Sequence, residues 1–188
     1  SSNTSYTNFI HSSILNFSYN TELIKSSGDI NFINCNFSKS KILDLNGRNG
    51  KFVDCNLSKT IFNQCLFHNF RFTNCNLSQA YFKDCTLQGV GSTCSFNNCQ
   101  LNNTIFDFTN FYLNSTDNIM FNNCNGENII MRNNDFKDNI VIIENSNITG
   151  DFSGTYIYQL ISSLKFKFYF IKQGGKFGNM NIFHHIYS

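Results

Sequence analysis

Proline and tryptophan are absent from this chain of 188 residues, and so are the motifs that usually reveal an enzyme. The sequence has no phosphate-binding loop, no HExxH and no Cys-X-X-Cys pair, and we therefore expect no catalytic residues, no metal site, no cofactor and no small-molecule substrate. It has no apolar run of about 18 residues, so no transmembrane helix is predicted. It begins at Ser1 without a methionine or a signal-peptide pattern, as a fragment or a processed form would.

Strong charge of either sign is also missing. The formal net charge is +2, and residues 30–146 contain nine basic and nine acidic residues. The tail is basic, because four lysines and no acid follow Asp151. A basic, aromatic tail is compatible with contact to nucleic acid or an anionic membrane. Four lysines are better explained as a solvated surface, and we do not expect nucleic acid as a partner.

What the sequence does have is an apolar residue at every fifth position from Phe32 to Leu87, broken only at Gly47. A smaller residue stands two positions before most of them. A period of five fits neither a helix nor a flat strand. It fits a chain that turns a corner every five residues, with two residues of each side pointing inward. Four sides close one coil, which explains why Cys35, Cys55 and Cys75 recur every 20 residues.

Two slips interrupt this frame. Before Ile30 the pattern is offset, and at residues 89–92 we interpret one side of a coil as shortened by one residue. That interpretation places Cys94 in the column of Cys35, Cys55 and Cys75. It places Cys124 in the opposite column, with Cys65 and Cys85, and leaves Cys99 outside both columns.

The segments Cys55-Asn56-Leu57-Ser58 and Cys75-Asn76-Leu77-Ser78 resemble the repeat of the pentapeptide-repeat family. The resemblance covers roughly residues 30–146 and implies an all-β solenoid, the right-handed quadrilateral β-helix. Residues 1–29 would then be an N-terminal cap or an irregular first coil, and residues 147–188 a C-terminal cap or interaction tail.

The frame also predicts which side chains fill the interior of the stack. These are the central residues of the sides and the cysteines two positions before them: Phe32, Cys35, Phe37, Phe52, Cys55, Leu57, Phe62, Cys65, Phe67, Phe72, Cys75, Leu77, Phe82, Cys85, Leu87, Phe96, Leu101, Phe106, Phe111 and Phe121.

The eight cysteines are predicted to be free structural thiols. Stacked cysteines would have parallel Cβ vectors, which is poor geometry for a disulfide, and a buried free cysteine behaves as a small apolar residue. This interpretation favours the cytoplasm or another reducing compartment. Asn-X-Ser/Thr sequons leave a secretory location open, although the repeat itself generates several of them: Asn3, Asn16, Asn36, Asn56, Asn76, Asn102, Asn114 and Asn147.

The tail allows two interpretations. A helical stripe predicts a helix that ends at Gly174-Gly175; its residues, which are also the predicted interaction residues, are Ile157, Leu160, Ile161, Leu164, Phe168 and Ile171. The alternation in residues 165–168, followed by a turn at residues 173–176, predicts a hairpin instead. Either way the tail has more apolar surface than a cap needs, which marks an interface. Family precedent for such segments is dimerisation.

These observations favour a non-catalytic scaffold that docks a protein partner or a second copy through its C-terminal tail. The family resemblance adds an alternative, protection of a topoisomerase such as gyrase by DNA mimicry. That mechanism needs a strongly acidic rod, which the neutral residues 30–146 do not supply, and long projecting loops are not expected. A secreted effector or a glycosylated luminal binding domain is a third possibility.

Overall fold

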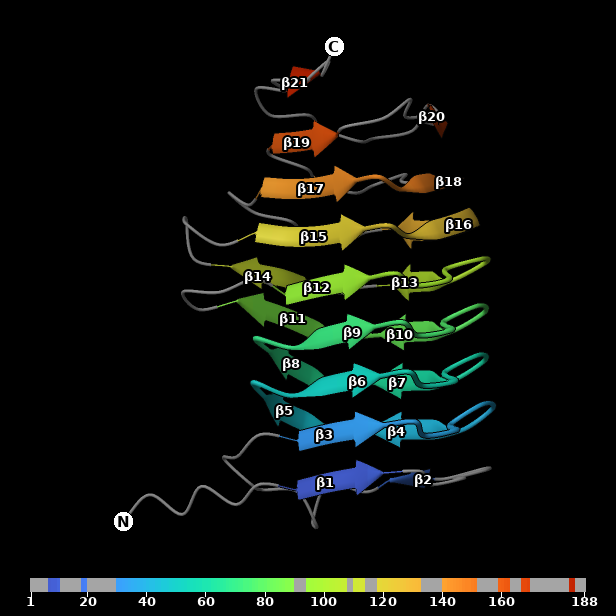
Figure 1. Cartoon of the computed structure of the whole chain (residues 1–188), viewed down its shortest axis with the longest axis vertical. Coiled ribbons are helices and arrows are strands. Elements are labelled where there is room, and N and C mark those ends of the chain that lie inside the picture. The colour runs from blue at the N-terminus through green and yellow to red at the C-terminus, as the bar shows by residue number, and fades with distance from the viewer. Residues whose placement is uncertain are drawn as a thin grey trace.

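The computed structural model describes residues 7–10, 18–19, 30–89, 94–107, 110–113, 118–132, 140–151, 159–162, 167–169 and 183–184. Every regular element in these residues is a β-strand, and every strand pair is parallel. Strands of successive coils lie one above another, with β1 and β21 at opposite ends of the stack (Figure 1). The fold is the predicted all-β parallel solenoid.

Three sheets form three sides of the stack. Sheet A contains nine strands: β1 (Thr7–Ile10), β3 (Ile30–Ile33), β6 (Lys51–Val53), β9 (Arg71–Thr73), β12 (Cys94–Asn97), β15 (Asn118–Asn122), β17 (Ile140–Glu144), β19 (Gln159–Ser162) and β21 (Phe183–His184). Sheet B contains eight: β2 (Ser18–Tyr19), β4 (Lys41–Leu43), β7 (Ile61–Asn63), β10 (Tyr81–Lys83), β13 (Ile105–Asp107), β16 (Asn125–Arg132), β18 (Asn147–Asp151) and β20 (Lys167–Tyr169). Sheet C contains four: β5 (Asn46–Arg48), β8 (Leu66–His68), β11 (Thr86–Gly89) and β14 (Asn110–Leu113).

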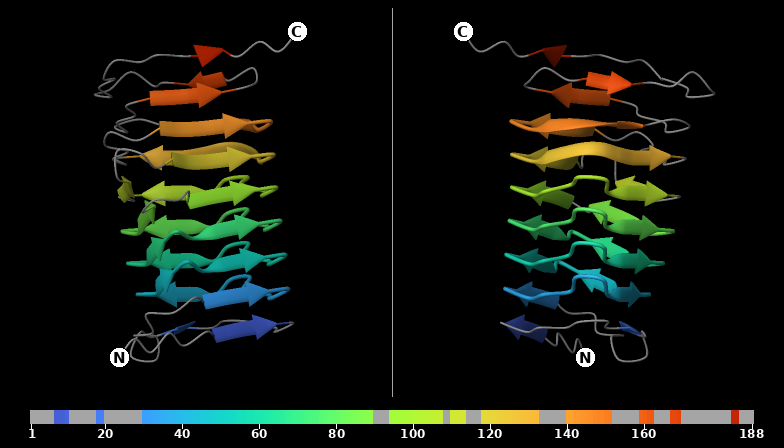
Figure 2. Two further views of the ribbon diagram at one scale, coloured as in Figure 1. Left: turned by 60° about the vertical axis from the view of Figure 1, so that its left-hand side comes forward. Right: turned by 90° about the vertical axis from the view of Figure 1, so that its right-hand side faces the viewer.

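The fourth side is held by single bridges instead of strands. They join one residue per coil in the series Asn36, Asn56, Asn76, Gln100 and Asn125. The first four of these residues are each followed by a tight turn, as where the amide of Ser40 donates to the carbonyl of Phe37 at 2.9 Å. These turns form the projecting loops seen in Figure 2.

The corners explain the abundance of asparagine. A residue with positive φ occurs at every fifth position through the regular coils, beginning with Asn34 (φ 54°), Lys39 (φ 62°) and Asp44 (φ 52°). Most of these corner residues are Asn or Asp, the non-glycine residues that best tolerate the left-handed region. Sequence reasoning found the apolar period but missed this second one, although Asn or Asp recurs two positions after the central residue.

Phenylalanine rings stack through the interior. On sheet A the ring centroids of Phe32 and Phe52 lie 4.6 Å apart, and those of Phe72 and Phe96 4.8 Å apart. Stacked pairs on sheet B, such as Phe62 and Phe82 at 4.6 Å, meet the sheet A column edge to face. These are favourable aromatic geometries. All the residues predicted for the interior are buried, except Phe111, whose side chain lies outside the described part.

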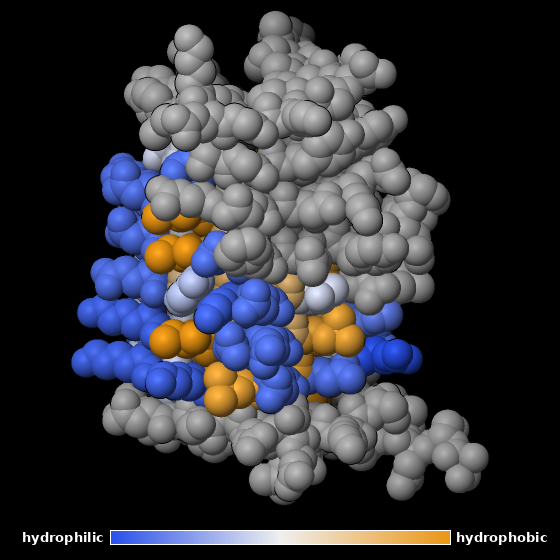
Figure 3. Space-filling model, turned by 180° about the vertical axis from the view of Figure 1, so that it is seen from behind, coloured by the Kyte–Doolittle hydropathy of each residue, from blue (hydrophilic) through white to orange (hydrophobic). Residues whose placement is uncertain are grey.

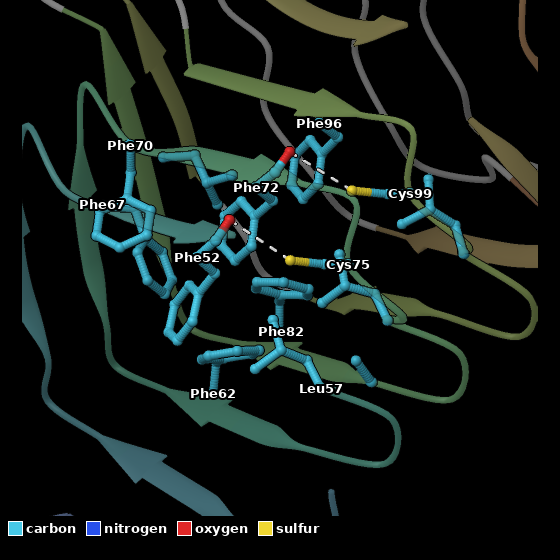
Figure 4. Packing of buried hydrophobic residues seen from close by; sticks show 14 of the residues in the cluster. Phe52, Leu57, Phe62, Phe67, Phe70, Phe72, Cys75, Phe82, Phe96 and Cys99 are labelled. Carbon is cyan, nitrogen blue, oxygen red and sulfur yellow. Dashed lines mark hydrogen bonds between the residues drawn. The ribbon is translucent and has the colours of Figure 1, made fainter. Parts of the chain in front are cut away.

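The small interior residues are tied to the neighbouring coil. The thiols of Cys75 and Cys99 point to the carbonyl oxygens of Phe52 and Phe72, each at 3.5 Å (Figure 4). The Thr60 hydroxyl donates in the same way to the carbonyl of Phe37 at 2.8 Å. A small residue two positions before the central one therefore fills volume and satisfies a buried carbonyl.

The structure corrects the predicted columns. Phe72 pairs with Phe96, 24 residues later, so the third coil is four residues longer than its predecessor and not one shorter. The bridges of Gln100 to Asn76 and to Asn125 place Cys99 and Cys124 in line with Cys75. Cys94 instead precedes Ser95, the partner of Arg71. Removing one residue and adding four residues both preserve the five-residue frame. The frame alone therefore could not reveal that the third coil is longer.

Both ends of the chain add strands to the stack. β1 and β2 pair with β3 and β4. In the tail, β19 pairs with β17, β20 with β18 and β21 with β19, all parallel. The helix and the hairpin are therefore both wrong for the described tail residues, among them Leu160 and Ile161 in β19 and Phe168 in β20. Ile157, Leu164 and Ile171 lie outside the described residues. Parallel pairing gives the exposed sheet edges partners, which an isolated helix would not do.

Candidate interaction surface

The outer face of sheet B presents two straight rows of side chains, because parallel pairing places equivalent residues of successive coils above one another. Among the residues whose side chains the structure describes, the first row, in order along the stack, is Lys41, Ile61, Tyr81, Ile105, Ile130 and Asp151. The second row, two residues further along each strand, contains Leu43, Asn63, Lys83 and Asp107, and Arg132 holds the next position. We call this surface the sheet B face.

The middle of the first row is apolar. Ile61, Tyr81, Ile105 and Ile130 are all partly exposed, and apolar side chains stack beside polar ones on the space-filling surface (Figure 3). The Tyr81 hydroxyl donates a 2.9 Å hydrogen bond to the Asp107 carboxylate in the next coil. Burial, together with this bond, raises the pKa of Tyr81. The hydrogen bond fixes the ring against the sheet, so this part of the surface is ordered.

Sequence reasoning missed this row. The position before the central residue is often polar, as it is at Asn31, Asn36 and Asn56. On sheet B that position carries Ile61, Tyr81, Ile105 and Ile130 instead. The signal was present as apolar letters outside the five-residue frame, but the correct 24- and 25-residue offsets were needed to bring them into one row.

The other two sheets carry basic and polar rows. On sheet A, Lys51 pairs with Arg71. On sheet C, Arg48 pairs with His68. Burial lowers the pKa of His68, and the nearby Arg48 charge lowers it further. These positions offer positive charge, the opposite of what a DNA-like surface requires.

The asparagines of the fourth side have a structural role. The side-chain oxygens of Asn36, Asn56 and Asn76 accept hydrogen bonds from the backbone amides of Ser38, Ser58 and Ser78 at 3.0–3.1 Å. This is the local bond by which Asn stabilises a turn. The sequons at these positions therefore follow from the turn chemistry of the repeat.

The thiols do not form a reactive site. All eight cysteines are free and buried. Burial raises the pKa of Cys94 to about 12 and raises that of Cys65 well above its usual value. Hydrogen bonding with Cys99 instead lowers the pKa of Cys124, whose side chain is nonetheless inaccessible to solvent. A nucleophilic cysteine needs both a thiolate and access, and none of the eight combines them.

Two further kinds of site are absent from the described residues. They contain no group of three or more His, Cys, Asp or Glu side chains that could hold a metal ion. No helix among them is long and apolar enough to cross a membrane.

The repeat matches a known protein family. Residues 26–106 match the family model of the pentapeptide repeat region. This part of the chain is a pentapeptide-repeat region. The match confirms the resemblance drawn from the Cys-Asn-Leu-Ser segments and covers the most regular coils.

Solved pentapeptide-repeat structures are similar at low identity. Rfr23 from the cyanobacterium Cyanothece 51142 is 16% identical, with a TM-score of 0.33 over 71% of this chain and 83% of that one. QnrB1, a plasmid-mediated fluoroquinolone resistance protein, is 14% identical, with a TM-score of 0.38 over 95% and 84%. No curated protein matches the sequence. At these values the similarity carries no functional argument.

Proposed function

We propose that this chain is a non-catalytic scaffold that docks a protein partner or a second copy of itself. The observation that supports this most is the ordered apolar row of the sheet B face, flanked by Lys41, Lys83, Asp107 and Asp151. An apolar strip with a charged rim is the usual anatomy of a protein-binding surface. The buried thiols contribute packing to the described interior, and the hydrogen-bonded asparagines stabilise the turns of the fourth side.

The C-terminal tail remains a second proposed docking segment. Its apolar residues, Ile157, Leu160, Ile161, Leu164, Phe168 and Ile171, are more numerous than a cap requires. The tail and the sheet B face make different predictions, because each would lose its partner through different substitutions.

DNA mimicry is less well supported. A topoisomerase that normally holds DNA would meet Lys51, Arg71, Arg48 and the turn lysines Lys39 and Lys59 on this stack. Positive side chains would repel a DNA-binding groove, since DNA carries one negative charge per ~1.7 Å. We therefore rank a protein partner of another kind above a topoisomerase.

Affinity capture from a lysate of the source cell tests the proposal with three baits. They are the 188-residue chain, an Ile61→Ser/Ile105→Ser variant of the sheet B face, and a Leu164→Ser/Phe168→Ser variant of the tail. Arg71→Gln, on another side of the stack, is the matched control. A protein retained by the chain and the control but lost with one variant supports a scaffold and names its surface. Equal recovery on all baits, or recovery of topoisomerase subunits by all of them, would overturn the proposal.

A further inference from the structure

We infer that the sheet B face binds the sheet B face of a second copy, with the two stacks antiparallel and related by a two-fold axis parallel to the strands. The inference rests on the proposed function, because it names the partner of one of its surfaces. It also moves self-association from the C-terminal tail, where the sequence placed it, to the side of the stack.

The order of residues along the first row favours an antiparallel pairing of two copies. The described side chains of this row begin with the cation Lys41, continue with Ile61, Tyr81, Ile105 and Ile130, and end with the anion Asp151; the positions next to these two ends are Ser18 and Tyr169. An antiparallel copy places its Asp151 opposite Lys41 and its Ile130 opposite Ile61. A row with opposite charges at its two ends and apolar residues between them is therefore complementary to its own reverse.

The second row gives the same axis independently. Lys83 is level with Tyr81, and Asp107 is level with Ile105 in the next coil. A two-fold axis between these two levels places Lys83 of each copy opposite Asp107 of the other. A two-fold interface requires this reciprocity, in which a residue meets its counterpart in both directions.

Only one register satisfies both rows. If one copy slides by one coil, about 4.8 Å, Lys83 faces Lys83 or Asp107 faces Asp107 across the axis. Like charges placed opposite each other across an interface disfavour that arrangement. The charges therefore select the register, while the isoleucines and Tyr81 supply the buried apolar area.

The size of the face predicts a weak dimer. Five coil spacings of about 4.8 Å and a five-residue side at about 3.3 Å per residue give a face of roughly 24 by 16 Å, or about 400 Å² on each copy. About 800 Å² in total lies below the usual range of stable complexes. We expect a monomer–dimer equilibrium that shifts with protein concentration and weakens as salt screens the four charge contacts.

Sedimentation equilibrium of the purified 188-residue chain with two charge-reversal variants is the test. In Lys83→Asp, each of the two equivalent contacts between positions 83 and 107 brings two aspartates together. In Asp107→Lys, each of these contacts brings two lysines together. We expect either variant alone to dimerise at least about tenfold more weakly than the wild-type chain. A mixture of the two restores both opposite-charge contacts, and we expect it to dimerise within about threefold of the wild-type chain.

The outcomes separate cleanly. Dimerisation that is lost in each variant and recovered in the mixture supports the inference. A wild-type chain that stays monomeric at high concentration, single variants that dimerise like it, or a mixture that stays monomeric would each overturn it. Thermal melts of each variant verify folding, because Asp107→Lys also removes the bond from Tyr81. A monomeric chain that still captures a lysate protein would reject the inference alone and leave the scaffold proposal standing.

A cross-linking measurement on the wild-type chain keeps the inference testable if a variant does not fold. A zero-length carbodiimide reagent joins an amine and a carboxylate only where they touch. Lys41 and Asp151 lie five coils apart in one chain, about 24 Å, so a bond between them must join two copies. We expect this cross-link in the dimer band and its loss with Asp151→Asn; a dimer band without it would contradict the proposed register.

Discussion

The ring of Phe70 occupies the space that a side chain at Gly47 would need. A Cβ placed on Gly47 would lie 2.7 Å from the ring, and one on Gly50 would lie 2.4 Å from it. Phe70 is in line with Gly50 and Cys94 of the two neighbouring coils, and Gly47 is in line with Phe67. The same exchange occurs at Gly126, where a Cβ would lie 2.6 Å from the Cδ1 atom of Ile129. The break in the apolar run is therefore compensated within the stack.

This exchange makes a testable prediction about coupled volume. Gly47→Leu restores the period of five but should destabilise the protein by about 1–3 kcal/mol, because the interior has no room for it. Phe70→Ala should cost about 3–5 kcal/mol. The double variant should be more stable than the sum of the two effects predicts, since one change makes room for the other. Urea unfolding of the four proteins measures the coupling; strict additivity would contradict this packing.

The positive-φ corners predict a stabilising substitution on the surface. Lys59 has a φ of 60°, which costs a residue with a Cβ about 1 kcal/mol relative to glycine. Lys59→Gly should therefore raise the free energy of unfolding by about 0.5–1 kcal/mol. The matched control is Lys41→Gly in strand β4, which should lower it by about the same amount. If denaturant unfolding showed both substitutions acting in the same direction, the corner assignment would be wrong.

The buried thiols predict a simple pattern of reactivity. All eight cysteines are buried and free. A disulfide reagent that releases a coloured thiolate should therefore react with none of them rapidly in the native protein. It should titrate eight thiols after denaturation. Reaction rates in the native protein should follow its opening rate, because each thiol must first reach solvent. Rapid modification of even one thiol before unfolding would contradict the buried columns.

The His68 imidazole predicts a local dependence on pH. Its pKa lies below the usual value of 6.5, first through burial and then through Arg48. The unfolded chain therefore binds a proton more readily than the folded one. The contribution of His68 to stability is fully present above pH 6.5 and is lost as the pH falls from there through the folded-state pKa. NMR titration of the imidazole should show Arg48→Gln raising this pKa, while Arg71→Gln on sheet A leaves it unchanged.

Much of this fold could be predicted from the sequence, for a physical reason. Every coil repeats the same local rule, so the apolar residues from Phe32 to Leu87 reveal the inward positions without knowledge of long-range contacts. The columns beyond Leu87 could not be predicted, because the five-residue frame does not distinguish a missing residue from four added ones. The prediction of a helix around Leu160 and Phe168 was wrong because it considered only the spacing of the apolar residues. It did not consider that the open edges of sheets A and B would pair with added strands.

The residues of the sheet B face could not be predicted from the sequence alone. Ile61, Tyr81, Ile105 and Ile130 are ordinary letters in sequence, spaced by 20, 24 and 25 residues. They form a surface only when the coils are aligned correctly. The charge pattern of Lys83 and Asp107 likewise has no meaning until both residues are known to occupy adjacent levels of one row.

The alignment of the third and fourth coils is therefore the claim on which the account depends, and NMR of the isotope-labelled chain tests it most directly. We predict nuclear Overhauser contacts between the ring protons of Phe72 and Phe96, and a coupling across the 3.0 Å hydrogen bond from the Gln100 amide to the Cys75 carbonyl. A Phe96 ring in contact with Leu77, together with a Gln100 amide bonded to the Ala80 carbonyl, would show the shorter coil. With that shorter coil, Tyr81 and Ile105 would no longer be aligned, and the proposed interaction surface would not exist.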